Sequence, residues 1–450
     1  MRGRTRWGSI AAMAAVLAFG AAACGDDEEG EDTAAAPTSA AAPAETPASS
    51  AADTTEAPAE SSAAEGGETT AAEGGETTAA EGGETSAPAD VEPMTLRIGF
   101  SGALEGAYAA YDATLLKGME YAAEKINAEG GPITVEIVSK NNKGDQAQSA
   151  TTTQELIDDG IKVFVLTTAD PSVAQGALIS AAGGVMSIGG NTAPQLAKDI
   201  GDRVFFFVFG DNVQAAAMAE YACEQGYKNA WLISSEEIPY TKDMPRYFKE
   251  TFEQCGGAIA GEDVYKIGQT EFRTQVTKIQ GADPAPDVIF SPMFVPDSGV
   301  FLKALRGAGV DTPFLSTDGN DSTLFADSGG SAVDGAVFST HGFAEEGSPL
   351  AEFLTDFETV TGAAPESTTF EAIGRDNVYA LVQAAMNAGS VEPDALIEGI
   401  KALKDFPGLT GTMTMNPDTR IPAKEVTLVK MAGATPELVG RRTPAFIPEP

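Results

Sequence analysis

From residue 94 onward, short runs of β-branched and aromatic residues alternate with helical patterns, and this alternation constrains the fold more than any other feature. Each apolar run is short and bounded by turn residues, which is typical of a strand in a parallel sheet. Strands that alternate with helices build βαβ units, so the sequence predicts an α/β fold. The first series of strands is expected at residues 95–100, 133–138, 162–166, 185–188 and 204–208, with helices at 114–127, 146–159, 172–182 and 193–198.

A second series follows a break near residues 209–213. Its strands are expected at 230–234, 258–265, 288–291 and 313–316, and its helices at 214–225, 242–254, 272–280 and 299–308. The folded part is too long for one doubly wound core, so two lobes are predicted. The later elements fit either lobe by pattern alone: strands at 335–339, 411–415 and 425–431 and helices at 350–361, 368–388 and 393–402.

In open parallel sheets, ligands bind beyond the carboxyl ends of the strands, where loops and helix N-termini converge. The loops in that position hold many of the Ser, Thr, Asp, Gly and Tyr residues of the chain. They span residues 101–112, 167–172, 189–193, 235–241, 292–296 and 317–321. Two lobes that present such loops to each other would form a ligand cleft.

The first 23 residues have the pattern of an export signal. Arg2, Arg4 and Arg6 precede an uncharged run that closes with Ala21-Ala22-Ala23-Cys24, a small-residue cleavage site. Small residues that run directly into a cysteine are typical of a lipoprotein signal, in which Cys24 becomes the lipidated first residue. The alternative is ordinary cleavage that leaves Cys24 as a free thiol. We favour lipidation, although Ala21 stands where a lipobox more often has Leu.

Residues 24–92 are predicted to form a disordered acidic tether. After Cys24 the segment contains no Lys or Arg and almost no large apolar residue, so it cannot bury enough surface to offset its ordering entropy. The octet Ala-Ala-Glu-Gly-Gly-Glu-Thr-Thr occurs twice in succession and is followed by a third copy that ends in Ser. So short a period indicates a spacer. Such a tether suits a domain that must reach a partner on the same membrane.

Charge and composition exclude several function classes. The formal net charge of -38 argues against nucleic acid as a partner. The chain has a single histidine, His341, interpreted as a surface or hinge imidazole, and it lacks a phosphate loop and the G-x-G-x-x-G order of a dinucleotide site. No catalytic residues, metal site or cofactor are therefore predicted, and the protein is not expected to be an enzyme.

Cys223 and Cys255 are the cysteines beyond Cys24. Both lie near the ends of predicted helices in a chain with an export signal. An exported chain permits a disulfide between them, and two unpaired buried thiols are the alternative. The sequence leaves both possibilities open.

Three segments resemble the opening of the type I periplasmic binding proteins, in the branch of the leucine/isoleucine/valine receptors. They are residues 97–102 (Arg-Ile-Gly-Phe-Ser-Gly), 118–120 (Gly-Met-Glu) and 126–131 (Ile-Asn-Ala-Glu-Gly-Gly). The resemblance extends to about residue 431. It implies two Rossmann-like lobes joined by three crossovers, which close on a small molecule like a flytrap. Lobe I would comprise 93–210 and 341–407, and lobe II 211–340 and 408–450.

The resemblance also implies ligand contacts from the first lobe. Residues 190–196 are similar to the family stretch Gly-Ala-Thr-x-Pro-x-Leu, so Thr192 would supply a hydroxyl and Asn191 a backbone contact for a ligand carboxylate. The Ser-Ser loop of the family falls on residues 168–172, where Asp170 is a departure. Asp170 would repel a carboxylate, so it turns away or the acidic group of the ligand is absent or placed differently. Ser172 is the hydroxyl that would replace the missing serine.

In the second lobe, the family carboxylate that receives a ligand ammonium matches Asp318. Phe294 matches an upstream aromatic that is usually Tyr, and Tyr240 matches another family aromatic. Tyr111 matches the first-lobe aromatic that covers the pocket. Core packing is the alternative for each aromatic, and a turn is the alternative for the Asp318 loop. The first-lobe disulfide of the family has no counterpart here.

The expected function is that of a monomeric solute-binding lipoprotein, held outside the cytoplasm by its lipid. It would bind an amino acid or a related small polar ligand and deliver it to an ABC permease and its ATPase. A sensor of the same fold is the alternative, and an exported α/β enzyme is a more distant one. The sequence alone does not separate transport from sensing.

Overall fold

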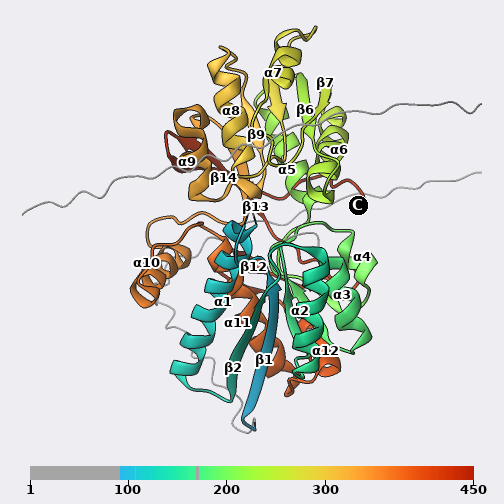
Figure 1. Cartoon of the computed structure of the whole chain (residues 1–450), viewed down its shortest axis with the longest axis vertical. Helices are drawn as coiled ribbons and strands as arrows, with labels where there is room; N and C mark the ends of the chain where they lie inside the picture. The colour runs from blue at the N-terminus through green and yellow to red at the C-terminus, as the bar shows by residue number, and fades with distance from the viewer. Residues whose placement is uncertain (1–91, 107, 169–171) are drawn as a thin grey trace, which may run out of the picture. The chain divides into compact units, whose positions relative to one another are not determined.

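The computed structural model describes residues 92–106, 108–168 and 172–450, which lie within one compact unit, Glu84–Pro450. The predicted signal peptide, Cys24, nearly all of the predicted tether and Asp170 lie outside the described residues. In the part that is described, no helix has both the length and the apolar character needed to cross a membrane. The described chain builds two sheets and a short hairpin (Figure 1).

The first sheet is entirely parallel, with the order β2-β1-β3-β4-β5. Strands β1, β3, β4 and β5 carry buried apolar residues on both faces because helices cover both sides, whereas the edge strand β2 is only partly buried. In α1, Leu115, Met119 and Ala122 recur at helical spacing and are fully buried. The elements are β1 (Met94–Gly102), α1 (Ala109–Glu129), β2 (Ile133–Asn141), α2 (Gln146–Asp158), β3 (Val163–Leu166), α3 (Ser172–Ala181), β4 (Val185–Ile188), α4 (Leu196–Ile200) and β5 (Val204–Phe206).

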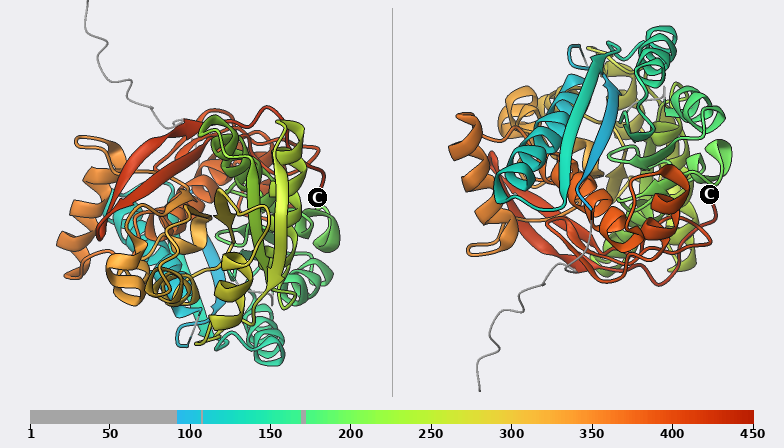
Figure 2. Two further views of the ribbon diagram at one scale, coloured as in Figure 1. Left: turned by 90° about the horizontal axis from the view of Figure 1, so that it is seen from above. Right: turned by 90° about the horizontal axis from the view of Figure 1, so that it is seen from below.

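The second sheet repeats this order in its parallel part, β7-β6-β8-β9-β10, and adds β13 and β14 antiparallel beyond β10. The two added strands run side by side in red in Figure 2. The elements are α5 (Asp211–Glu224), β6 (Asn229–Ser234), α6 (Pro239–Gln254), β7 (Ala258–Val264), α7 (Arg273–Gln280), β8 (Val288–Phe290), α8 (Asp297–Gly307), β9 (Phe314–Ser316), η1 (Asp318–Asn320), α9 (Thr323–Gly329), η2 (Gly330–Val333), β10 (Val337–Thr340), β13 (Val426–Ala432) and β14 (Thr435–Arg442).

Three late helices return to the first sheet: α10 (Pro349–Thr361), α11 (Phe370–Ala388) and α12 (Pro393–Lys401). Helix α11 packs on α1, and α12 packs on α11 and β4. The hairpin of β11 (Phe406–Gly408) and β12 (Gly411–Met413) then precedes β13. The chain therefore crosses between the lobes three times, after β5, after β10 and after α12. The predicted fold of two Rossmann-like lobes with three crossovers is confirmed.

A buried lysine connects two of these crossovers. Lys424 donates from Nζ to the Phe207 carbonyl at 3.2 Å and to Thr410 Oγ1 at 2.7 Å. Phe207 belongs to the first crossover, whereas Thr410 and Lys424 belong to the third. Burial lowers the pKa of Lys424 to about 8. The joint between the lobes is thus built around a polar contact.

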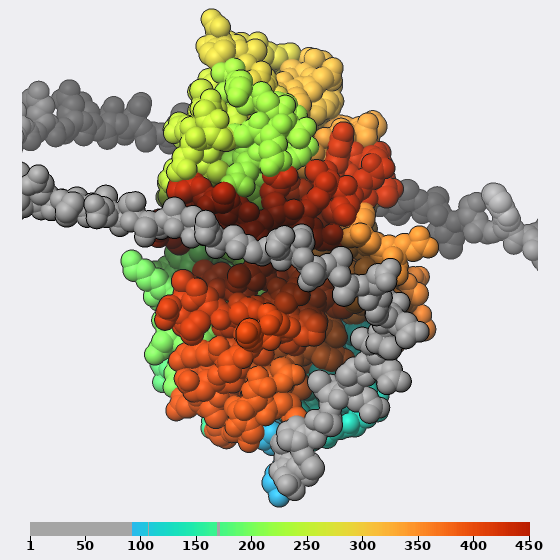
Figure 3. Space-filling view, turned by 180° about the vertical axis from the view of Figure 1, so that it is seen from behind, coloured from blue at the N-terminus to red at the C-terminus, as the bar shows by residue number. Residues whose placement is uncertain are grey.

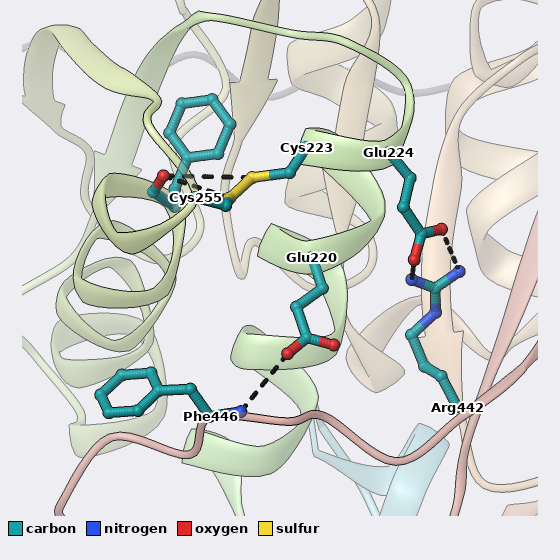
Figure 4. The surroundings of a disulfide bond; sticks show 7 residues. Glu220, Cys223, Glu224, Cys255, Arg442 and Phe446 are labelled. Atoms are coloured by element: carbon teal, nitrogen blue, oxygen red, sulfur yellow. Dashed lines mark hydrogen bonds and ion pairs between the residues drawn. A yellow bond between two sulfur atoms is a disulfide. The ribbon is translucent and has the colours of Figure 1, made fainter.

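A disulfide joins α5 to α6 in the second lobe. Cys223 and Cys255 are bonded, with their Cα atoms 6.4 Å apart (Figure 4). Of the two alternatives that the sequence left open, the structure has the bonded one. The C-terminal segment contacts both helices. On α5, Asn212 Nδ2 donates to the Pro448 carbonyl at 2.9 Å and Glu220 accepts from the Ala445 N–H at 2.7 Å, and on α6, Arg246 donates to the Glu449 carbonyl at 3.3 Å. This segment belongs to the red region beside the second lobe in Figure 3.

The elements that were not predicted are β11, β14, α9 and the short helices η1 and η2. In β14, exposed and half-buried residues alternate, because successive side chains of a strand point to opposite faces of the sheet and one face of β14 is left uncovered. Its sequence, Thr-Pro-Glu-Leu-Val-Gly-Arg-Arg, therefore lacks the continuous apolar run by which the other strands were found. Helix α9 has seven residues, too few to produce a clear helical period.

Candidate ligand-binding site

A cavity lies between the two lobes at the carboxyl ends of their strands. Its wall combines loops of the first sheet with η1 and the start of α6 from the second lobe. The lining residues are Tyr108, Tyr111, Thr168, Val173, Gly190, Asn191, Thr192, Ala193, Gln195, Leu196, Asp199, Ile238, Pro239, Tyr240, Phe294, Asp318, Gly319 and Phe370. Six of the eight predicted ligand-contact residues are in this wall: Tyr111, Asn191, Thr192, Tyr240, Phe294 and Asp318.

Asp318 is the acidic centre of the second-lobe wall. It begins η1, two residues after the end of β9, and is only 2% exposed. Its Oδ1 accepts hydrogen bonds from Tyr240 Oη at 2.9 Å and from Gln214 Nε2 at 3.0 Å. Its Oδ2 lies 3.1 Å from His341 Nε2. Three side chains from α6, α5 and the second crossover thus fix this carboxylate at the cavity wall.

Aromatic rings form much of the remaining wall. The Phe294 ring contacts Tyr108, Tyr111 and Tyr240 with centroids 6.2 to 6.3 Å apart, and Tyr111 also packs against Phe370 at 5.2 Å. Tyr111 donates from Oη to the Gly319 carbonyl at 2.9 Å, which joins the two lobes directly. Burial raises the pKa of Tyr111 and of Tyr240 well above the usual value, so both hydroxyls keep their protons.

The first-lobe wall carries Thr192 and Asn191. The Thr192 carbonyl accepts from the Asp211 N–H at 2.7 Å, and its hydroxyl accepts from Gln214 Nε2 at 3.4 Å. Asn191 Oδ1 accepts from the Ala193 N–H at 3.1 Å, which fixes the turn before α4. Gln214 also contacts Asp318, so one amide connects the neutral wall of lobe I with the acid of lobe II.

Ser172, the first residue of α3, is not a lining residue of the cavity. It is fully buried, and its hydroxyl donates to the Thr167 carbonyl at 2.9 Å and accepts from Asn191 Nδ2 at 3.4 Å. Ser172 therefore supports Asn191 through a hydrogen bond and does not itself line the cavity. Asp170, the predicted departure from the family, lies outside the described residues.

His341 corrects one interpretation from the sequence. The imidazole was read as a surface or hinge group, and the surface reading is wrong because the side chain is 1% exposed and contacts Asp318. It follows β10 directly, at the start of the second crossover. Ligand sites lie beyond the carboxyl ends of parallel strands. If this rule is also applied to the strand predicted at 335–339, it indicates His341 as a candidate site residue.

Gln214, Tyr108 and Phe370 were also missed. Gln214 lies on α5, where an amide has no sequence signal for a ligand site. Phe370 begins α11, which the sequence pattern could not assign to a lobe.

Next to Gln214, burial raises the pKa of Asp211 well above its usual value. The Asp211 Oδ1 also accepts from Gln214 Nε2 at 3.3 Å, so the Gln214 amide contacts both acids.

The described ranges contain no cluster of three His, Cys, Asp or Glu side chains that could hold a metal ion. Nor do the described residues of the cavity wall include a Lys or Arg. The arrangement provides hydrogen bonds, the buried carboxylate of Asp318, the exposed carboxylate of Asp199 and aromatic surface, which suit the capture of a small molecule.

Residues 95–435 match the family model described as periplasmic binding protein. The chain belongs to the periplasmic binding protein family. Members of this family are solute-binding proteins that act outside the cytoplasm, and they are not enzymes. The resemblance stated from the sequence is thereby confirmed.

Curated members of the family cover most of the chain. The Leu/Ile/Val-binding protein homolog 2 of Brucella abortus is 24% identical over 326 residues, which are 71% of this chain and 86% of that protein. The leucine-, isoleucine-, valine-, threonine- and alanine-binding protein of Pseudomonas aeruginosa is 23% identical over 312 residues, 68% of this chain and 82% of that protein.

Solved structures of the family show the same fold. The branched-chain amino acid transporter substrate-binding protein of Streptococcus pneumoniae, in complex with isoleucine, aligns with a TM-score of 0.70 and 25% identity, covering 78% of this chain and 99% of that one. A solute-binding protein of an ABC transporter from R. palustris, in complex with benzoate, aligns with a TM-score of 0.70 and 18% identity over 79% of this chain and 98% of that one. At that identity the likeness concerns the fold alone.

Proposed function

We propose that this chain is an extracytoplasmic solute-binding lipoprotein of an ABC importer and that it binds an amino acid or a related small ammonium compound. The observation that carries the proposal is Asp318, a buried carboxylate in the wall of an aromatic cavity between the lobes. Thr192 and Asn191 lie in the opposite wall. A ligand that contacts both walls would favour the closed lobes over the open ones.

The chemistry of the wall favours a cation with an apolar body. A ligand ammonium beside Asp318 gains a charge-assisted hydrogen bond worth about 1.5 to 3 kcal/mol. The rings of Tyr111, Phe294 and Phe370 offer apolar contact for a side chain. An amino acid has both parts, and its carboxylate would face the neutral groups of Thr192 and Asn191. The names of the curated relatives and the isoleucine complex support this ligand class.

The test is calorimetric titration of the ligand-stripped protein. The panel contains branched, aromatic, acidic and amide amino acids, short peptides, polyamines and simple carboxylates that include benzoate. Micromolar or tighter binding of an amino acid is expected. If no α-amino acid shows binding while a carboxylate does, the proposed ligand class is wrong, and only the assignment of the fold is retained.

Asp318→Asn is expected to weaken an ammonium ligand by about tenfold or more, or about 1.4 kcal/mol. Asp199→Asn is the matched control, because Asp199 lines the same cavity but is exposed. That control is expected to change affinity by less than about threefold. Equal affinity of Asp318→Asn and the unchanged protein would remove Asp318 from the site.

The lipid anchor is tested separately. Cys24→Ser is expected to release the protein from membranes and to abolish labelling by radioactive fatty acid. If the unchanged protein takes up no label and is recovered in the soluble fraction, ordinary signal cleavage is the correct alternative. Ligand binding is unaffected in either case, because the site lies in the folded unit.

A further inference from the structure

The single histidine of the chain is built into the binding site. His341 is 1% exposed, and its Nε2 lies 3.1 Å from Asp318 Oδ2. Its ring stacks on Phe209 with centroids 3.9 Å apart and planes at 15°. Phe209 belongs to the first crossover and His341 begins the second, so one imidazole contacts both crossovers and the acid of the cavity.

The hydrogen bonds around the pair define one tautomer. Asp318 Oδ1 already accepts from Tyr240 and Gln214, whereas Oδ2 faces the imidazole. A carboxylate oxygen accepts, so Nε2 carries the proton and donates it. Among the described residues, His341 Nδ1 has no hydrogen-bond partner. The neutral imidazole therefore fits this cavity, since a second proton on Nδ1 would be buried without an acceptor.

The charged groups that face His341 come from two segments. Asp318 and the nearby Asp321 lie in and after η1, and Lys424 lies before β13. Asp321 is itself held by the hydroxyls of Thr340 and Thr369. Burial lowers the pKa of His341, and Lys424 acts in the same direction, whereas the two carboxylates oppose them. Neutral His341 leaves the negative charge of Asp318 available to a ligand cation.

We propose that His341 is a positioning residue that controls the charge of the ligand-binding carboxylate: as neutral imidazole it holds Asp318 ready for a ligand ammonium, and as imidazolium it neutralises Asp318 and releases the ligand. This inference rests on the function proposed above. Protonation converts the neutral-donor contact into an ion pair between His341 and Asp318, and a second cation then finds no net charge to bind. Affinity for an ammonium ligand falls as the pH drops through the pKa of His341 in the empty protein.

The experiment uses L-isoleucine and its 2-oxo acid, which lacks the ammonium group, as probes from about pH 8 to about pH 4.5. With the unchanged protein, affinity for isoleucine is expected to fall by at least about tenfold across this range. The oxo acid is expected to show no such loss. Pulsed amide exchange at each pH confirms that the protein remains folded. Isoleucine affinity that is constant with pH would overturn the proposal.

Two variants separate control of charge from simple packing. His341→Gln places an amide N–H near the position of Nε2 but cannot be protonated, so its affinity for isoleucine, at whatever level it stands at pH 7.5, is expected to lose the pH dependence. His341→Leu removes the donor, and its affinity is expected to drop at every pH. If His341→Gln keeps the pH dependence of the unchanged protein, another group titrates and the proposal is wrong.

A spectroscopic arm gives a result even if isoleucine does not bind. The imidazole signals of the one histidine are followed by NMR against pH in the unchanged protein and in Asp318→Asn. Loss of the carboxylate is expected to lower the midpoint by at least about one pH unit, because the anion stabilises the imidazolium. Equal midpoints would overturn the pairing. A clear shift without isoleucine binding would show that the pair exists and that the proposed ligand class is the part that fails.

Discussion

The two lobes share one strand order and are held together in different ways. In the first lobe, α1 and α11 approach until their backbones touch: a Cβ on Gly118 would lie 1.9 Å from the Glu371 carbonyl oxygen, and one on Gly374 would lie 2.0 Å from that of Leu115. In the second lobe, the disulfide between Cys223 and Cys255 joins α5 to α6, and β13 and β14 widen the sheet. Shared topology therefore does not require shared means of stabilisation.

The lobes also differ in what they offer a ligand. The second lobe contributes the carboxylate of Asp318 and its donors Gln214 and Tyr240, with His341 added from the second crossover, whereas the first lobe contributes the neutral groups of Thr192 and Asn191. In the proposed function, the second lobe would recognise charge and the first would select shape and hydrogen bonding. Four substitutions test these differences, and they follow in order of decreasing expected effect.

Gly118→Ala is expected to destabilise the protein by more than about 3 kcal/mol, since the added methyl group meets backbone that cannot rotate away. Urea unfolding measures the loss. Gly307→Ala in α8 is the matched control, because nothing lies within 4 Å of its Cβ position. That control is expected to be neutral or slightly stabilising. Equal effects of the two substitutions would refute the close contact of α1 and α11.

Replacing Cys223 and Cys255 together by alanine is expected to cost about 2 to 3 kcal/mol, because the disulfide restricts the unfolded chain. Hydrogen exchange should accelerate in α5 and α6 and remain unchanged in α1 and α11. A reducing agent added to the unchanged protein should reproduce the result, and added to the variant should do nothing. Faster exchange in both lobes would mean that the disulfide does not act on the second lobe alone.

Glu371→Gln tests a buried acid of the first lobe. Burial raises the pKa of Glu371 to about 7, so the stability that this group contributes is complete below about pH 4.5 and is lost as the pH rises through 7. Glutamine cannot ionise, so the variant should be more stable than the unchanged protein by about 2 kcal/mol at pH 8 and equal to it near pH 4.5. The measurement is the urea unfolding midpoint of the variant and of the unchanged protein at both pH values. Glu358→Gln, at an exposed position, is the control. A gain that is the same at both pH values would refute ionisation as the cause.

Thr192→Val keeps the shape of the side chain and removes its hydroxyl. The expected loss of ligand affinity is about fivefold, or about 1 kcal/mol, because the first lobe offers several neutral groups and not one dominant charge. Calorimetry measures the affinity, and Thr151→Val on the exposed face of α2 is the control. A loss larger than that of Asp318→Asn would reverse the division of roles between the lobes.

The parallel core was predictable because its strands are short, continuous apolar runs, as in Val163–Leu166 and Val185–Ile188. The one-sided strand β14 was not, since half of its residues face away from the core. In the site, resemblance to a family located Asp318 and Thr192 in the sequence. Gln214 and His341 contact Asp318 only because the fold brings α5 and the second crossover next to it. These contacts join residues far apart in the chain, so no local sequence pattern predicts them.

The position of β1 bears on the proposed membrane anchor. In a parallel sheet, all strands begin at one edge and the ligand site lies at the other. Strand β1 has nine residues, so Met94 enters the sheet about 30 Å from the edge where the cavity opens. Whatever holds the chain upstream of Met94 therefore attaches to the far side of the first lobe. An anchor attached on that side would leave the entrance of the cavity accessible to solute. Anchoring and ligand binding would then use opposite sides of the first lobe.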